Sequence, residues 1–150
     1  MTARSRDHAV PQLADFPYRL SDNVRFADLD PNNHVNNAVY ASYFESARVT
    51  LIRGLVPEGM SWVLARLDIH FRSELHWPGT IELGIGLVKL GRTSTHFDQA
   101  VFSGGVCVAS ARAVTVLVDL HSRKPTPLTE DLIEKLKPWW RRGFAHDGQN

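Results

Sequence analysis

Apolar residues change their spacing along the chain, and each spacing predicts a different kind of element. Between Val39 and Leu51 they recur every three or four positions, which predicts one helix of about four to five turns. From residue 61 to 119 the spacing changes to two, the period of half-buried strands. Turn signals at Pro78-Gly79 and Gly104-Gly105 divide that stretch.

Four successive strands are expected at about 61–76, 80–90, 94–102 and 106–119, and a weaker one within 16–26. In the first, alternation predicts that Val63, Ala65, Leu67, Ile69 and Phe71 share one face and that Leu64, Arg66, Asp68, His70 and Arg72 share the other. Because tight turns join these strands, they must pair antiparallel. Thr129 is in place to cap a short closing helix.

This order of elements predicts an α+β fold, in which a curved antiparallel sheet of about five strands wraps around one long central helix. We expect a flexible N-terminal arm at residues 1–15 and a single domain at residues 16–150. Such a sheet leaves Val/Ala-rich edge strands, which are usually covered by a second subunit. The sequence therefore predicts a homodimer.

Composition excludes several classes of protein. The 150 residues carry 17 Lys+Arg against 16 Asp+Glu, so a net charge of +1 gives no case for a nucleic-acid binder. The lone Cys107 forms no internal disulfide, and a zinc cluster of cysteines is excluded. No signal peptide or membrane span is apparent. We therefore expect a small cytoplasmic protein without a metal or cofactor.

Candidate chemistry concentrates in the loop before the predicted helix, which holds Asp28, Asp30, Asn32, Asn33, His34, Asn36 and Asn37. The first turn of a helix offers unpaired N–H groups and partial positive charge, which suit a developing oxyanion. A nearby carboxylate can attack a carbonyl polarised there or activate water against it. The alternative is that these residues only cap the helix and close turns. A calcium loop is excluded, because Asn33 and Val39 stand where Gly and Glu are required.

At this loop the sequence resembles a known family. The run R-F-A-D-L-D-P-N-N-H-V-N-N-A-V-Y-x-x-Y-F-E-x-A-R, from Arg25 to Arg48, is similar to the opening of hotdog-fold thioesterases of the 4-hydroxybenzoyl-CoA thioesterase type. The stretch G-R-T-S-T-H-F-D-Q-A-V-F, from Gly91 to Phe102, resembles them more weakly. The resemblance spans residues 20–120 and implies a hotdog fold that forms dimers and often tetramers.

The resemblance also implies roles for single residues. Asp30 matches the catalytic carboxylate, acting as nucleophile or as general base. Asn37, seven residues later, matches the position whose backbone N–H binds the thioester oxygen, and some relatives have His there. Asp28 would brace the loop, and Arg92 matches one of several basic residues that contact the CoA phosphates. His34 is a candidate for orienting substrate, or a structural histidine.

Two assignments rest on the helix itself. Tyr40, with Tyr43 and Phe44, is a candidate for the wall of the acyl pocket, although such residues serve equally well as helix core. Glu45 matches a helix carboxylate used by another hotdog lineage, but its i, i+3 spacing to Arg48 favours an ordinary ion pair.

These observations predict an enzyme that hydrolyses an acyl-CoA, or an acyl-carrier-protein thioester, to free acid and thiol. Two alternatives stay open. One is a hotdog enoyl-thioester hydratase, because the stretch from Asp30 to His34 approximates that group's Asp/His pattern. The other is a non-catalytic module that binds acyl thioesters. Neither nucleic acid nor membrane is expected as a partner.

Overall fold

The protein folds around one five-stranded antiparallel sheet with strand order β1-β3-β4-β5-β2. In the computed structural model, which describes residues 9–144, the strands are β1 (Tyr18–Asn23), β2 (Met60–Phe71), β3 (Thr80–Leu90), β4 (Ser94–Ser103) and β5 (Val106–Asp119). The helices are α1 (Val39–Ile52) and α2 (Glu130–Leu136). Short 3-10 turns also lie at Leu13–Asp15, Phe26–Asp28 and Lys137–Trp139. β3 and β5 match their predicted bounds, and β1 is shorter than the segment from which it was expected.

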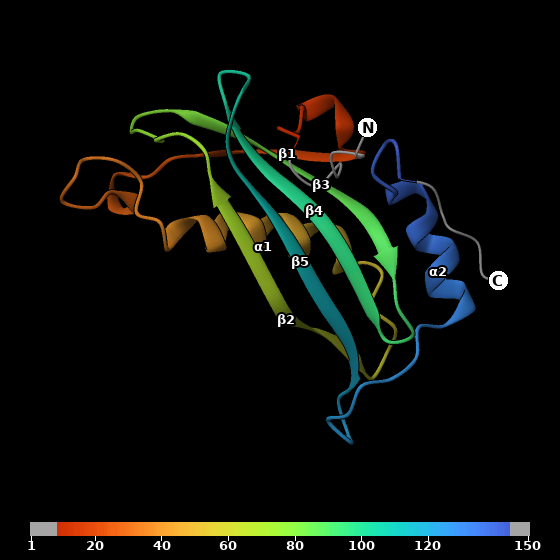
Figure 1. Ribbon diagram of the computed structural model, residues 1–150. Coiled ribbons are helices and arrows are strands. Elements are labelled where there is room, and N and C mark those ends of the chain that lie inside the picture. The colour runs from red at the N-terminus through yellow and green to blue at the C-terminus, as the bar shows by residue number, and fades with distance from the viewer. Residues whose placement is uncertain (1–8, 145–150) are drawn as a thin grey trace, which may run out of the picture.

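α1 lies across one face of the sheet, here called the inner face, and β1, β3 and β4 supply most of its contacts (Figure 1). Its buried side chains include those that define the predicted stripe, namely Tyr40, Tyr43, Phe44, Ala47 and Leu51. The helix has 14 residues, about four turns, which is the short end of the predicted length. A second helix, α2, follows the sheet, and the Thr129 side chain accepts the Leu132 N–H at 3.2 Å, as the sequence predicted.

A bulge in β2 corrects the predicted faces of that strand. Leu64 pairs with Thr115, whereas Arg66 pairs with Val114, so Ala65 is an extra residue without a partner on β5. Because opposed residues share a face, Leu64 lies on the same face as Leu67, and the predicted alternation holds only after the bulge. A one-residue insertion reverses the side of every residue before it.

β2 also ends at Phe71 rather than near residue 76. The N–H groups of Arg72 and Ser73 both reach the carbonyl of Val108, at 2.8 and 3.1 Å, which ends the regular ladder. The chain then forms a segment, residues 73–79, in which Leu75 is buried and its carbonyl accepts the N–H of Val35 at 2.8 Å. The residues expected to extend the strand instead support the loop before α1.

The opposite side of the sheet, here called the outer face, is covered by the segments that flank the domain. A Cβ at Gly84 would lie 2.6 Å from the Phe16 ring, and one at Gly86 would lie 2.8 Å from Cβ of Arg141, so both contacts require glycine. The predicted N-terminal arm overlaps the described residues only from 9 to 15, where Leu13 packs beside Phe16. Residues 1–8 of that arm lie outside the described part.

Candidate active site

The loop between residues 28 and 38 is closed on itself and anchored to the rest of the fold. Leu29 and Val35 form an antiparallel bridge. Within it, the Asp30 N–H donates to the His34 carbonyl at 3.0 Å, and the Asn33 N–H donates to the Asp30 carbonyl at 2.9 Å. Asn33 takes a left-handed φ of 65°, a conformation that Asn tolerates better than most residues. The loop therefore has a defined shape.

Asp28 braces this loop against α1, as the sequence predicted. Its carboxylate is buried and accepts the Tyr43 hydroxyl at 2.6 Å and the Arg25 N–H at 2.8 Å. Burial, followed by the hydrogen bond to Asp28, raises the pKa of Tyr43, so the phenol stays protonated and donates. The Asp28 carbonyl also accepts the N–H of Asn36 at 2.9 Å. Asp28 thus fixes both ends of the loop.

Asp30 keeps one carboxylate oxygen without a hydrogen bond. Its Oδ1 accepts the Asn32 N–H at 2.9 Å. Its Oδ2 lies 3.8 Å from Nδ1 of His34 and makes no hydrogen bond with any residue in the described part of the chain. The side chain is only 14% exposed and that of His34 is 24% exposed. The Asp30 carboxylate is therefore partly shielded from water and is held in place through the other oxygen.

Asn36 and Asn37 differ in their hydrogen bonding at the start of α1. Asn36 closes the turn, because its Oδ1 accepts the Ala38 N–H at 2.8 Å and its carbonyl accepts the Val39 N–H at 2.9 Å. Among residues 9–144 the N–H of Asn37 has no acceptor. Asn36 thus closes the turn before α1, whose N-cap residue, Ala38, makes no side-chain cap. The Asn37 N–H remains available to a ligand at the positive end of the helix.

Tyr40 lies between the buried core and the exposed end of β2. Its ring makes edge contacts with Tyr43, centroid to centroid 6.0 Å, and with Phe71 at 5.3 Å. Phe71 is half exposed, whereas Tyr40 is buried. Burial and, to a lesser degree, Glu74 raise the pKa of the Tyr40 phenol. Tyr40 is therefore a core residue, and its role as a pocket wall stays a prediction.

Arg92 is not brought close to Asp30 within one chain. It lies exposed in the turn between β3 and β4, at the end of the sheet opposite the loop before α1 (Figure 1). The strand between these ends, β3, has 11 residues, a length of about 33 Å.

The predicted ion pair between Glu45 and Arg48 is absent. Glu45 is exposed, whereas Arg48 is 4% exposed and donates to Oε1 of Gln99 at 3.0 Å. Gln99 in turn donates to the Phe44 carbonyl at 2.9 Å. Arg48 lies on the buried side of α1, so burial lowers its pKa and Glu45 opposes that effect only from a distance. Sequence reasoning missed this pair, although a Gln between Phe97 and Val101 on one strand face was a signal.

No group of three or more His, Cys, Asp or Glu side chains within residues 9–144 is arranged to hold a metal ion. None of the helices described there is long and apolar enough to cross a membrane.

Comparison with known proteins gives consistent matches over most of the chain. A family model described as the thioesterase-like superfamily matches residues 24–136. The long-chain acyl-CoA thioesterase FadM of Escherichia coli K12 is 27% identical over 122 residues, 76% of this chain and 92% of that protein. The acyl-CoA thioester hydrolase YbgC of Escherichia coli O157:H7 is 21% identical over 128 residues, 80% of this chain and 96% of that protein.

A solved structure is also similar. It is a thioesterase from Thermus thermophilus, complexed with coenzyme A and Zn. It shares 33% identity with this chain and superposes with a TM-score of 0.74, covering 82% of this chain and 93% of that one.

The brace formed by Asp28 leads to a stability prediction. Tyr43→Phe leaves the buried Asp28 carboxylate short of one donor, so we expect the free energy of unfolding to fall by about 1–3 kcal/mol. Tyr40→Phe, a buried tyrosine on the same helix whose hydroxyl bonds to no described residue, is the control and should cost clearly less. Urea unfolding monitored by circular dichroism measures both. Equal losses in the two variants would contradict the brace.

Proposed function

The chain belongs to the thioesterase-like superfamily, and from that premise we propose that it hydrolyses acyl-CoA thioesters to a free acid and CoA. An acyl-carrier-protein thioester is the second candidate substrate. The relatives named as acyl-CoA thioesterases support this class of reaction. The observation that carries the proposal is the combination, in one short loop, of Oδ2 of Asp30 and the N–H of Asn37, neither of which is hydrogen-bonded within the described part of the chain.

These two groups supply complementary parts of the reaction. The thioester oxygen accepts the Asn37 N–H, and the positive end of α1 stabilises the negative charge that develops on that oxygen. Asp30 acts either as nucleophile on the carbonyl carbon or as the base that removes a proton from water. In both routes the C–S bond breaks, the thiolate leaves and takes a proton, and water supplies the oxygen of the released acid.

Two further residues are proposed to hold the substrate. His34, beside the Asp30 carboxylate, would orient the thioester without replacing Asp30 as the reacting group. Tyr40 and the half-exposed Phe71 would form a wall for the acyl chain near the start of the helix.

Arg92 is proposed to contact the CoA phosphates across a dimer. It lies at the opposite end of the sheet from Asp30 of the same chain, so it would serve the site of a second copy. The geometry of β2 supports such a dimer. β2 is an edge strand whose Val63, Leu64 and Phe71 are 43%, 46% and 50% exposed, and a second copy paired to this edge would cover its backbone and part of these side chains on both faces. Assembly of dimers into a homotetramer is left open.

The hydratase is retained as a second candidate because the Asp30 carboxylate and the His34 ring lie 3.8 Å apart. Hydration of an enoyl thioester consumes the double bond and releases no thiol. Crotonyl-CoA distinguishes the reactions, because loss of the enoyl absorbance without thiol release supports the hydratase. Saturable binding of acyl-CoA without either reaction would support a binding module.

Substitution of Asp30 tests the proposed chemistry. We expect Asp30→Asn to lower the rate of thiol release by about 10²–10⁴-fold, because the amide neither attacks nor accepts a proton. Glu45→Gln, which removes a solvent-facing carboxylate of α1, should keep the wild-type rate. A thiol-trapping assay over short, long and aromatic acyl-CoAs measures both variants, with circular dichroism to verify folding. Wild-type turnover in Asp30→Asn would refute the assignment.

The dimer has its own test. Leu64→Lys places a charge at a half-exposed apolar position of the edge strand, so we expect this variant to sediment near 16.9 kDa where the wild type sediments at twice that mass. Leu120→Lys is the matched control, because Leu120 is also 46% exposed but lies outside β2. Analytical ultracentrifugation gives the masses. A monomeric wild type, or a dimeric Leu64→Lys variant, would contradict pairing through β2.

A further inference from the structure

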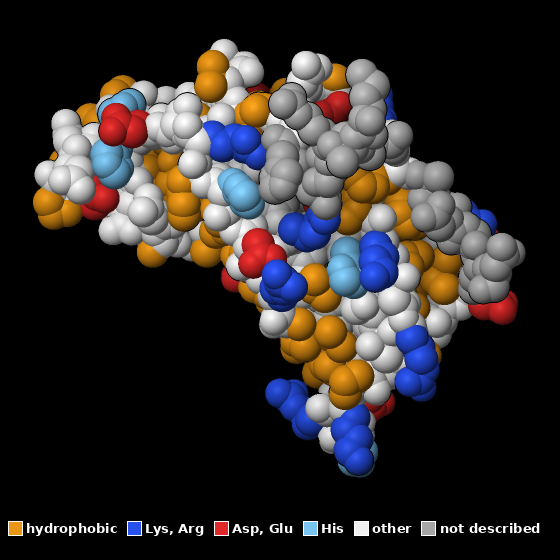
Figure 2. All heavy atoms as spheres, viewed as in Figure 1, with side chains coloured by type: hydrophobic (Ala, Val, Ile, Leu, Met, Phe, Trp, Pro, Cys, Tyr) orange, Lys and Arg blue, Asp and Glu red, His pale blue; other side chains and the backbone are white. Residues whose placement is uncertain are grey.

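A cavity of about 260 Å³ lies on the outer face of the sheet, on the side away from α1. Its lining includes Phe16, His70, Arg72, Ser110, Arg112 and Arg141. Strand pairing explains how these residues meet, since His70 on β2 is opposite Ser110 on β5. Figure 2 views the molecule from this side and shows Lys, Arg and His side chains distributed over the sheet. None of these lining residues belongs to the proposed active site.

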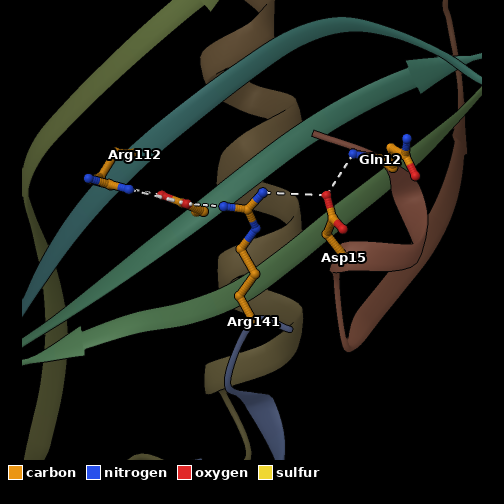
Figure 3. A network of polar contacts seen from close by, with 5 residues as sticks. Gln12, Asp15, Arg112 and Arg141 are labelled. Carbon is orange, nitrogen blue, oxygen red and sulfur yellow. Dashed lines mark hydrogen bonds and ion pairs between the residues drawn. The ribbon is translucent and has the colours of Figure 1, made fainter. Parts of the chain in front are cut away.

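Most carboxylates around the cavity are already engaged by arginine. Asp98 accepts two bonds from Arg112, from Nε at 2.8 Å and from Nη2 at 3.2 Å, and a third from Nη1 of Arg141 at 2.8 Å (Figure 3). Arg141 also reaches Asp15 at 3.4 Å. On β2, Asp68 pairs with Arg66 at 2.8 Å. These acids therefore leave little negative charge for further cations.

Arg72 is a cation of the cavity that has no carboxylate partner among residues 9–144. Its Nε donates to the Ser110 hydroxyl at 3.0 Å, and within residues 9–144 its terminal N–H groups have no acceptor and no carboxylate within ion-pair distance. The Nε–H of Arg141 is buried beside the same cavity and bonds to no described residue. Unused guanidinium donors in a concave site are the groups that bind oxyanions.

The positive charges around the cavity also shift the pKa values of two neighbouring groups. Burial first, and then the charges of Lys89 and Arg112, lower the pKa of His96, which lies on the outer face. Burial raises the pKa of the Cys107 thiol, and Arg72 opposes that effect. The positive charges of Arg72 and Arg112 thus change the pKa values of other residues on this face.

The remaining wall of the cavity is apolar. Phe16, Pro11 and Ala9 line the side formed by the segment before β1, and the Arg141 guanidinium lies over the Phe16 ring at 5.4 Å from its centroid. A ligand that fits must therefore present one anionic end to Arg72 and an apolar body to Phe16. The volume is small for a ligand site, which favours a molecule of few atoms.

We propose that this outer-face cavity binds a small organic carboxylate, with its carboxylate on Arg72 and Ser110 and its apolar part against Phe16 and Pro11. The site is separate from the loop of Asp30, which precedes the helix on the inner face. Its ligand class includes short acids of the kind that thioester hydrolysis releases, but the proposal does not depend on that reaction.

Titration calorimetry of the full chain with benzoate, butyrate and inorganic phosphate, in the absence of thioester, tests the proposal. We expect saturable binding of benzoate or butyrate to the wild type and at least about tenfold weaker binding to Arg72→Gln. Arg53→Gln, which removes an exposed arginine at the end of α1 and outside the cavity, should bind within about twofold of wild type. Proton NMR should show a shift of the His70 ring signals on binding.

Three results would overturn the proposal. These are the absence of carboxylate binding to the wild type, equal binding to Arg72→Gln and wild type, or phosphate binding as tight as that of the organic acids. Thermal melting confirms that both variants are folded. Thiol release by Arg72→Gln is measured separately and should equal that of wild type, so a failure of binding and a failure of the proposed hydrolysis are distinguishable.

Discussion

The buried carboxylate of Asp28 is the constraint on which the candidate site depends. A carboxylate in the interior is costly unless it is hydrogen-bonded, and here its Oδ2 accepts both the Tyr43 hydroxyl and the Arg25 N–H. Because Tyr43 belongs to α1, the bond fixes the loop relative to the helix. Asp30 follows two residues later, and the N–H of Asn36 bonds back to Asp28, which leaves the next N–H, that of Asn37, free at the helix start. One structural carboxylate thereby positions the reactive one.

The sheet lies between α1 on its inner face and the segments that pack on its outer face. Its inner face is occupied by α1, and the small glycines at positions 84 and 86 let Phe16 and Arg141 lie close on the outer face. Both faces are therefore covered near β3 and β4, whereas β2 remains an open edge with exposed apolar residues. The proposed acyl wall at Phe71 and the proposed carboxylate cavity at Arg72 lie at the end of that strand, on its two sides. Neighbouring residues of a strand point to opposite faces, which allows two sites so near in sequence.

Periodicity was sufficient to predict the helix and most strand bounds, because the buried stripe of α1 and the strands β3 and β5 follow regular spacing. It failed where geometry depends on a partner strand. The bulge at Ala65 leaves no mark in the residue pattern, yet it reverses the facing of Leu64. Arg48 was assigned to an ion pair with Glu45 because local spacing says nothing of Gln99 across the core. The cluster of Arg72, Arg112 and Arg141 also requires strand register and a C-terminal segment that crosses the sheet. The loop was located from its composition, but the unpaired Asn37 N–H needed coordinates.

The cooperation of Asp30 and Asn37 is tested most directly by a crystal structure with a hydrolysis-resistant acyl-CoA analogue in which a methylene group replaces the thioester sulfur. We expect the analogue's carbonyl oxygen to lie about 2.9 Å from the backbone nitrogen of Asn37. We also expect the Asp30 carboxylate to lie within about 3.5 Å of the carbonyl carbon, or of a water in contact with it. A carbonyl oxygen bound by other donors, with Asp30 turned away from the carbon and from any attacking water, would refute the roles proposed for Asp30 and Asn37.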